Sequence, residues 1–316
     1  LFQYQPYELA LSSKLVNVVK EHQLELLHVH YAIPHAYAGY MAKKILEEEG
    51  IKIPMVTTLH GTDITLVGSH PFYKPAVTFS IKKSDAVTSV SQNLKEETLR
   101  LFGLENGIDV VPNFIDMQKY NVHYTDCQRA MMAASNERIV AHVSNLRPVK
   151  RTLDVIEVFD RILKKIPAKL IMVGEGPDKE AAEDLCIAKG IDQQVLFLGN
   201  SSEVNKILSF TDLFLLPSEK ESFGLAALEA MASGVPVVSS NTGGLPEVNL
   251  HGVSGFLNDI GDVAGMADHA IRILENPETL AKFKEQAREV ASKFQIDQIV
   301  PLYEKVYQKA LDHVLS

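Results

Sequence analysis

The stretch from residue 213 to residue 239, LFLLPSEKESFGLAALEAMASGVPVVS, carries the pattern that decides the fold. An apolar run, Leu213–Leu216, leads into a polar loop and then a helical segment of small residues that ends near Gly234. A second apolar run follows at Val235–Ser239. Short apolar runs of this length predict buried strands, and a helix between two of them is the crossover unit of a parallel sheet. The stretch therefore predicts one β–α–β unit of an α/β protein.

The same alternation continues towards both ends of the chain. A chain of 316 residues with 46% hydrophobic residues is also longer than one core usually organises. We therefore expect an α/β protein with two doubly wound, Rossmann-like domains. The further strands that we expect are Leu26–His30, Pro54–Leu59, Ala86–Val90 and Asp109–Pro112 in the first domain, and Arg138–Ser144, Lys169–Val173 and Val195–Leu198 in the second.

The boundaries follow from where the pattern weakens. We predict an N-terminal domain over residues 1–116, a polar linker over 117–136 and a C-terminal domain over 137–298. The last segment, 299–316, has helical spacing and no following strand, so we expect a helix that could pack on either domain, including back on the N-terminal one. The chain opens on a helix-like stretch, Pro6–His22, whereas a doubly wound domain normally opens on a strand and a glycine turn. We therefore expect a first β–α–β unit to be missing from the sequence as given.

The charge balance restricts the classes of partner. The chain has 31 Lys and Arg against 40 Asp and Glu, a net charge of −9, which disfavours nucleic acid and anionic membranes. The two cysteines, Cys127 and Cys186, have no metal-ligand spacing. No apolar stretch reaches the roughly 20 residues of a membrane span, and the N-terminus does not read as a secretory signal. We expect a cytoplasmic protein with small-molecule partners, and we leave a homo-oligomer open.

The loop-to-helix junction after Leu213–Leu216 is the first candidate site. Such a junction presents free backbone N–H groups and a positive dipole end, which suit a diphosphate, and Gly224 allows a ligand to approach closely. Glu221 and Glu229 are eight residues apart, about two helical turns, so they can contact an elongated ligand at two points. Taken one at a time, each glutamate is better explained as a solvated helix residue.

Other candidate residues also follow predicted strands, at the edge where open parallel sheets bind ligands. Gly174-Glu175-Gly176-Pro177 and Gly243-Gly244 have this position, although simple turns explain them too. No G-x-G-x-x-G fingerprint occurs, which disfavours a dehydrogenase. In the first domain the strand-end residues are His60, Tyr31, Thr58 and Gly61. We do not expect His28, His30 and His60 to form a metal site, because strand spacing should keep their side chains from converging.

Several of these segments together resemble the family 4 retaining glycosyltransferases. The segments are Glu221–Glu229 with its E-x7-E spacing, Val143–Lys150, Val173–Pro177, Thr242–Glu247, Val111–Asp116 and Ser84–Ser91. The resemblance covers nearly the whole chain. It implies the GT-B architecture, in which two Rossmann-like domains face a cleft and the second domain binds a UDP-sugar.

The resemblance also implies roles for individual residues. Lys150 would neutralise the departing diphosphate, with Asn145 or Arg147 assisting. Many family members have Arg at the place of Asn145 and Gly at that of Arg151, so the basic partner of Lys150 is left open. The full expectation is Lys150, Glu221 and His60 as catalytic residues; Asn145, Arg147, Gly174, Phe223, Gly224, Leu225 and Glu229 as donor-binding; Tyr31, Thr58, Gly61 and Lys74 as acceptor-binding; and no metal or other cofactor.

Two segments of the first domain narrow the expected substrates. Thr58–Thr65 and His28–His35 are similar to family members of bacillithiol biosynthesis. This similarity implies transfer of N-acetylglucosamine from UDP-N-acetylglucosamine to the hydroxyl of L-malate, with Lys74 among the groups that meet the carboxylates. The alternatives are a family 4 enzyme with another sugar acceptor, a non-catalytic nucleotide-sugar-binding module, and a sugar-nucleotide epimerase.

Overall fold

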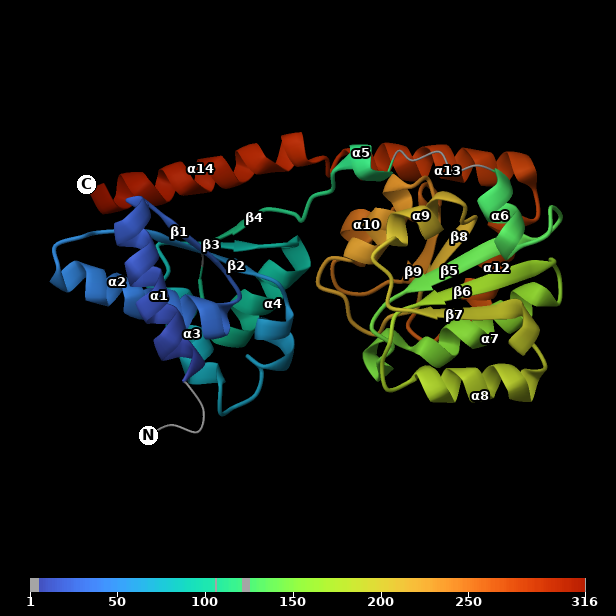
Figure 1. Cartoon of the computed structure of the whole chain (residues 1–316), viewed down its shortest axis with the longest axis horizontal. Coiled ribbons are helices and arrows are strands. Elements are labelled where there is room, and N and C mark those ends of the chain that lie inside the picture. The colour runs from blue at the N-terminus through green and yellow to red at the C-terminus, as the bar shows by residue number, and fades with distance from the viewer. Residues whose placement is uncertain (1–5, 106, 121–125, 316) are drawn as a thin grey trace. The chain divides into compact units, whose positions relative to one another are not determined.

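A computed structural model of the chain describes residues 6–105, 107–120 and 126–315 (Figure 1). Its internal contacts divide the chain into two compact units. Unit 1 comprises Leu1–Asn113 and Asp297–Ser316, and unit 2 comprises Phe114–Ile296. Within the described residues, no helix is both long enough and apolar enough to cross a membrane.

Unit 1 contains a four-stranded parallel sheet in the order β1-β2-β3-β4. The ends of each strand lie within a residue or two of those of a predicted one, and the two central strands are fully buried. The strands are β1 (Leu27–His30), β2 (Met55–Leu59), β3 (Ala86–Ser89) and β4 (Ile108–Val110). The helical segments are α1 (Tyr7–His22), η1 (Ala32–Ala36), α2 (Tyr37–Glu48), η2 (Thr62–Leu66), α3 (Lys74–Lys83), α4 (Gln92–Phe102) and α14 (Ile296–Leu315).

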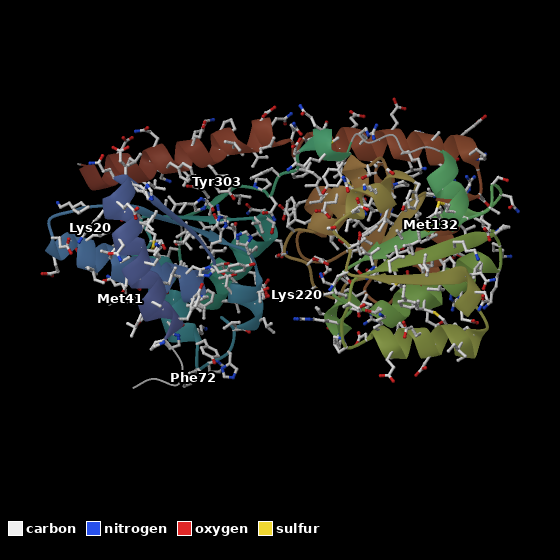
Figure 2. All side chains as sticks on the ribbon, viewed as in Figure 1. Lys20, Met41, Phe72, Met132, Lys220 and Tyr303 are labelled. Atoms are coloured by element: carbon white, nitrogen blue, oxygen red, sulfur yellow. The ribbon has the colours of Figure 1, made fainter. Side chains whose placement is uncertain are left out.

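The C-terminal helix α14 packs on the sheet of unit 1. Ile299, Tyr303, Val306 and Ala310 recur every three or four residues, so they share one helix face, and they form a core cluster with Val56, Ala86 and Val111 of the sheet region. Figure 2 shows Tyr303 beneath α14, on the side of the sheet. A helix that ends the chain is thereby built into the N-terminal unit.

Unit 2 contains a six-stranded parallel sheet in the order β10-β9-β8-β5-β6-β7. Its strands are β5 (Arg138–Val143), β6 (Ala168–Val173), β7 (Val195–Gly199), β8 (Leu213–Leu216), β9 (Val237–Ser240) and β10 (Gly255–Asn258). Its helical segments are α5 (Met117–Tyr120), α6 (Asp126–Met132), η3 (Pro148–Lys150), α7 (Thr152–Leu163), α8 (Lys179–Lys189), η4 (Asp192–Gln194), α9 (Val204–Ser209), α10 (Leu225–Ala232), α11 (Leu245–Val248), α12 (Val263–Leu274) and α13 (Pro277–Ser292).

The strand order of unit 2 reverses between β5 and β8. From β5 the chain builds outward through β6 and β7, and it then returns to the other side of β5 to add β8, β9 and β10. Helices cover both faces of the sheet (Figure 1). In sheets of this kind the loops after the two strands at the reversal separate and leave a ligand-binding crevice at their carboxyl ends. The loops after β5 and β8 are therefore the expected place for a ligand in unit 2.

Three details differ from the sequence prediction. Strand β10 was not predicted, because Gly255–Asn258 contains only two large apolar residues and follows a turn-rich segment. Strand β9 begins at Val237 rather than at Val235, since Pro236 precedes it and cannot donate to a ladder. Within the predicted linker 117–136, α5 and α6 are helical and belong to unit 2, while residues 121–125 lie outside the described residues.

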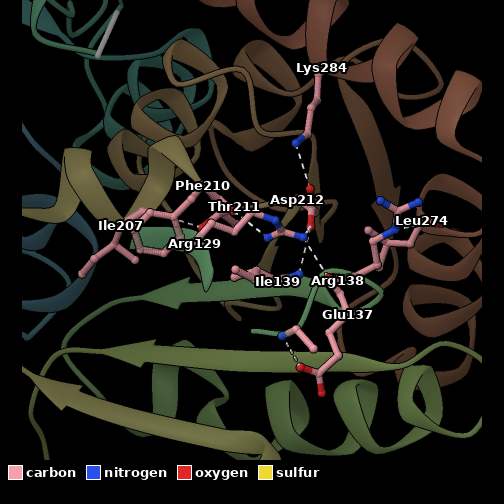
Figure 3. Close-up of polar contacts among 11 residues, drawn as sticks. Arg129, Glu137, Arg138, Ile139, Ile207, Phe210, Thr211, Asp212, Leu274 and Lys284 are labelled. Carbon is pink, nitrogen blue, oxygen red and sulfur yellow. Dashed lines mark hydrogen bonds and ion pairs between the residues drawn. The ribbon is translucent and has the colours of Figure 1, made fainter. Parts of the chain in front are cut away.

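The amino end of β8 is anchored by the buried carboxylate of Asp212 (Figure 3). Asp212 accepts hydrogen bonds from Arg129 Nη2 at 3.1 Å, from Lys284 Nζ at 2.9 Å and from the Ile139 amide at 3.0 Å. Although burial opposes ionisation, the Lys284 charge, the Ile139 amide and Arg129 hold the pKa of Asp212 below its ordinary value. This charge cluster joins α6, β5 and α13 to the start of β8.

Candidate active site

A lysine–glutamate pair lies at the carboxyl ends of β5 and β8. Lys150 Nζ donates to Glu221 Oε1 at 2.6 Å, and the buried Ser218 hydroxyl donates to the same oxygen at 2.8 Å. The side chains of Lys150 and Glu221 are 21% and 12% exposed. Two residues that were predicted to be catalytic thus meet at the reversal of strand order, where a ligand is expected.

Glycines brace the loop that carries Glu221. Gly243 has φ +55°, and a Cβ there would lie 1.8 Å from the carbonyl oxygen of Glu221. The Gly244 amide donates to that same carbonyl at 2.9 Å. The loop after β9 therefore packs directly on the loop after β8, and only glycine at position 243 allows this approach.

The loop after β5 is held in a similar way by the turn after β6. Gly174 has φ +125°, and a Cβ there would lie 1.8 Å from the carbonyl oxygen of Ser144. Beneath this loop the fully buried His142 donates from Nδ1 to the Leu215 carbonyl at 2.9 Å. Its Nε2 is then left to accept from the Ser144 hydroxyl at 2.7 Å. The packing accounts for Gly174, and a contact between Gly174 and the donor stays a prediction.

Glu229 lies about one turn into α10, whereas Glu221 is in the loop before this helix, so the two are not separated by two helical turns as predicted. Glu229 has a partner that the sequence did not suggest. The Tyr120 hydroxyl, at the end of α5, donates a hydrogen bond to the Glu229 carboxylate. Burial raises the pKa of Glu229, and the Tyr120 hydrogen bond partly offsets that rise. Burial and the Glu229 charge raise the pKa of Tyr120 in turn. Tyr120 falls in the predicted linker, where no periodic pattern singles it out.

The remaining predicted donor-binding residues fall into two groups. Asn145 and Arg147 are exposed on the loop after β5, and Leu225 is 46% exposed at the start of α10. Phe223, by contrast, is 2% exposed and packs edge-on against Phe294, with ring centroids 5.7 Å apart. The Phe223 side chain belongs to the core, so only its backbone is available to a ligand.

The start of α10 and the residue before α7 have left-handed backbone. Gly224 has φ +101°, and a Cβ there would lie 2.6 Å from Leu245 Cδ2, so the position requires glycine. Arg151 has φ +51° and pairs with Asp154 at 2.7 Å. The left-handed conformation at Arg151 is one that favours glycine over residues with a Cβ.

In unit 1 the predicted acceptor side is built on adjacent strand ends. Tyr31 follows β1, and His60 follows β2, with their ring centroids 4.8 Å apart. His30 Nδ1 and His60 Nε2 share a hydrogen bond of 2.8 Å. Tyr31 is 36% exposed and has φ +75°, whereas Gly61 is buried with φ +111°.

A buried polar chain supports these histidines. Thr58 is fully buried, and its hydroxyl lies 2.7 Å from His28 Nε2 and 2.7 Å from the Thr88 hydroxyl. The Tyr307 hydroxyl of α14 lies 2.8 Å from His28 Nδ1. In this arrangement Thr58 supports the site from below and is not open to an acceptor. Tyr307 was missed, since nothing local in the sequence relates it to His28.

The rings of the three histidines lie close together. The ring centroids of His28 and His30 are 4.6 Å apart, and those of His30 and His60 are 5.0 Å apart. Residues two apart on a strand point to the same side, which brings the rings of His28 and His30 together. Their nitrogen atoms do not meet at one point, because His28 bonds Thr58 and Tyr307 while His30 bonds His60. Burial and the neighbouring rings lower the pKa of His28 and His60 to about 4, so both are neutral near pH 7.

Lys74 has a different place from the other predicted acceptor residues. It begins α3 and lines a surface hollow of about 620 Å³ together with Pro71, Pro75, Thr78, Phe79, Lys82 and Lys83. Tyr31, Thr58, His60 and Gly61 do not line this hollow. Within unit 1 the structure thus groups Tyr31, His60 and Gly61 but does not bring Lys74 to them.

Chemically, the carboxyl end of the sheet in unit 2 combines the Lys150–Glu221 pair with the backbone amides of the first turn of α10. The Lys150 ammonium has three donors, and Glu221 uses one of them. The others, with the amides at the start of α10, suit a diphosphate that gains negative charge as a bond to it breaks. Such a site can stabilise a nucleoside diphosphate as a leaving group.

Comparison with known proteins agrees with this chemistry. Residues 128–290 match the family described as "Glycosyl transferases group 1", and residues 1–119 match "Glycosyltransferase Family 4". Among curated proteins, the chain is 44% identical over 313 residues to the N-acetyl-alpha-D-glucosaminyl L-malate synthase of Bacillus anthracis. That similarity covers 98% of this chain and 81% of the relative. The 2-deoxystreptamine N-acetyl-D-glucosaminyltransferase of Niallia circulans is 28% identical, over 91% of this chain and 77% of that protein.

Solved structures support the fold. HepE of Anabaena in complex with UDP matches with a TM-score of 0.80 and 23% identity, over 94% of this chain and 81% of that one. A glycosyltransferase of Rickettsia africae matches with a TM-score of 0.78 and 19% identity, over 98% and 83%. These likenesses confirm the GT-B fold class, with its two parallel α/β sheets. Together with the family matches, they show that the chain belongs to the glycosyltransferases, with a group 1 domain that follows a family 4 domain.

Proposed function

We propose that this glycosyltransferase transfers N-acetylglucosamine from UDP-N-acetylglucosamine to the hydroxyl of L-malate with retention of the α configuration. The observation that carries the proposal is the 44% identity, over 98% of the chain, to a protein named for this reaction. The second unit supports it, because the Lys150–Glu221 pair lies at the reversal of strand order, where a nucleotide-sugar would bind.

The donor is held by unit 2 in this proposal. Glu229 accepts hydrogen bonds from the ribose hydroxyls; a carboxylate has about four lone-pair positions, so it can do so while it still accepts from Tyr120. The amides at the start of α10 and the Lys150 ammonium contact the diphosphate. Glu221 keeps Lys150 in place, and its second carboxylate oxygen is directed to the sugar hydroxyls.

The reaction proceeds by attack on the same face of the sugar that the leaving group occupies. The acceptor hydroxyl oxygen forms the new bond to C1 as the bond between C1 and the β-phosphate oxygen breaks, and the hydroxyl proton passes to that phosphate oxygen. No motif places a carboxylate nucleophile in unit 1, which favours this route over a double displacement. Lys150 contributes to rate because the charge on UDP grows only in the transition state.

Malate recognition rests on neutral donors in unit 1. His60 is uncharged near pH 7, since burial and His30 lower its pKa to about 4, yet it retains one N–H. Tyr31 adds a half-buried hydroxyl next to the His60 ring. Polar groups that are arranged for two carboxylates are left unpaired by an acid that has only one.

The test compares L-malate with L-lactate, which keeps the hydroxyl and lacks the second carboxylate. With UDP-N-acetylglucosamine as donor, UDP release should be at least roughly 10²-fold faster with malate at equal concentration. Mass spectrometry should identify the glycosylated malate. Equal rates, or no stimulation by malate above donor hydrolysis, would exclude malate and leave the glycosyltransferase assignment in place. The same assay with 2-deoxystreptamine in place of malate tests the acceptor that the name of the Niallia circulans relative suggests.

The proposal includes no metal or other cofactor, because Lys150 provides the positive charge at the diphosphate. Initial rates should then be the same before and after treatment with EDTA. A loss of activity that Mg²⁺ or Mn²⁺ restores would contradict this part of the proposal and assign a share of the charge stabilisation to a metal ion.

A further inference from the structure

A buried carboxylate connects the two loops that carry Tyr31 and His60. Asp63, the second residue of η2, is 2% exposed. Its Oδ2 accepts from the Ala32 amide at 2.8 Å, and its Oδ1 accepts from the amides of Gly61 at 3.0 Å and His60 at 3.2 Å. One side chain therefore binds backbone from the ends of both β1 and β2.

These loops have conformations that a peptide does not adopt unaided. Tyr31 has φ +75°, in the region that disfavours residues with a Cβ, and Gly61 has φ +111°. The Tyr31 amide still donates to the Thr58 carbonyl at 2.9 Å, as in the sheet. The chain leaves the sheet after Tyr31, at Ala32. Unusual backbone of this kind persists only where surrounding contacts determine it. Asp63 supplies such a contact on each loop.

A second aspartate of unit 1 provides a contrast. Asp85 also binds backbone, since its Oδ2 accepts from the Met55 amide at 2.6 Å, and it pairs with Lys43. It lies at the amino end of β3 and therefore at the edge of the sheet opposite to Tyr31 and His60. The two carboxylates have similar chemistry, but only Asp63 bonds the loops at the carboxyl ends.

We propose that Asp63 is the positioning residue of the acceptor side: its three amide hydrogen bonds set the separation of the Tyr31 and His60 rings. The inference rests on the proposed function where it assigns Tyr31 and His60 to the acceptor. Asp63 itself does not contact the acceptor. Its effect passes through backbone, and it should appear in the acceptor step while binding of UDP to unit 2 is unchanged.

The diagnostic substitution is Asp63→Asn, which preserves shape and removes one acceptor. An amide side chain presents one oxygen and one NH₂ group, so it can satisfy either the Ala32 amide or the His60 and Gly61 amides, but not both sets. The backbone amides of one loop then lose their acceptor and face the NH₂ group of the substituted side chain, which is itself a donor. Asp85→Asn is the matched control, because it also removes a backbone acceptor from unit 1.

Two readouts are compared for the full chain. The first is steady-state kinetics, in which Asp63→Asn should lower kcat/KM for the acceptor by roughly 10²-fold, as displaced reacting groups do, with KM for the donor and Kd for UDP unchanged. The second is NMR titration of the His60 ring. Loosened loops admit water, so the pKa of His60 should rise from about 4 by roughly one unit toward 6.5. Asp85→Asn should produce neither change, although both variants should lose thermal stability.

The outcomes separate the two proposals. Wild-type kinetics and an unmoved His60 titration in Asp63→Asn would overturn the positioning role. Equal kinetic losses in Asp63→Asn and Asp85→Asn would also overturn it, because the effect would then be general destabilisation. If the wild-type enzyme is not stimulated by malate, the proposed acceptor fails, and the His60 titration in the two variants still decides for or against Asp63.

Discussion

In unit 2 a carboxylate pairs with a cation at each end of the six-stranded sheet, but the two carboxylates have different roles. At the amino end of β8, Asp212 binds two cations and an amide and is 6% exposed. Beyond the carboxyl end of the same strand, Glu221 binds one cation and one hydroxyl. Asp212 joins three elements of the fold, whereas Glu221 holds a lysine whose other donors remain for a ligand.

This difference indicates that the role of an ion pair depends on the end of the sheet at which it lies. A parallel sheet with reversed strand order opens a crevice only at its carboxyl ends. Charges at the amino end have no ligand to meet, and we expect their removal to change stability. Removal of charges at the carboxyl end should change catalysis. Four predictions test this division.

The largest effect is expected for Asp212→Ala. The substitution removes three hydrogen bonds to a buried carboxylate, from the half-buried Arg129 and Lys284 and from the Ile139 amide. At about 1.5 kcal/mol or more for each bond to a charged group, it should lower the free energy of unfolding by roughly 3–5 kcal/mol. Urea denaturation measures the loss, and kcat/KM below the transition should equal that of wild type. The control is the exposed Lys164, which pairs with Asp160, since Lys164→Ala should cost less than about 1 kcal/mol. A catalytic defect in folded Asp212→Ala would break the comparison.

Lys150→Ala tests the opposite end. Loss of one preorganised cation at the diphosphate should lower kcat by roughly 10²–10³-fold, while the midpoint of thermal unfolding changes little. Single-turnover rates with saturating donor measure the chemical step directly. A fall in UDP affinity with kcat nearly unchanged would show instead that Lys150 binds the ground state and the transition state equally.

A smaller effect is expected for Glu229→Gln, which removes the charge proposed to accept the ribose hydroxyls. A hydrogen bond to a charged group contributes about 1.5–3 kcal/mol, so KM for the donor should rise at least roughly tenfold. Tyr120→Phe removes only the hydroxyl that holds Glu229 and should raise this KM less. If Tyr120→Phe has the larger effect, the role given to Glu229 belongs to the tyrosine.

The smallest effect is a pH dependence of stability. His142 is fully buried, and burial lowers its pKa to about 4 from 6.5. Below pH 6.5 the unfolded chain binds a proton that the folded chain refuses, so the stability from a neutral His142 is complete above pH 6.5 and is lost progressively towards pH 4. Denaturation midpoints across this range should fall less steeply for His142→Gln than for wild type. An unchanged slope would show that His142 is protonated in the folded protein.

The sequence by itself predicted most of the fold. Periodic apolar runs located nine of the strands in two parallel series, because side-chain burial is a local property that the chain repeats. It also placed candidate residues at strand ends, but it put Glu221 and Glu229 two helical turns apart, whereas Glu221 lies in the loop before α10. It failed where the pattern is weak: β10 has only two large apolar residues between Gly255 and Asn258, and Tyr120 lies in a stretch without periodicity.

Only the tertiary structure decided which of these residues act together. Lys150 and Glu221 are 71 residues apart in sequence and meet at 2.6 Å because the strand order reverses between β5 and β8. His28 and Tyr307, 279 residues apart, meet because the last helix packs on the first unit. Asp63 reaches Ala32 because β1 and β2 are neighbours in register. Periodicity shows which face of an element is buried, but partners across elements depend on strand order and loop path, and neither is written in any local window of sequence.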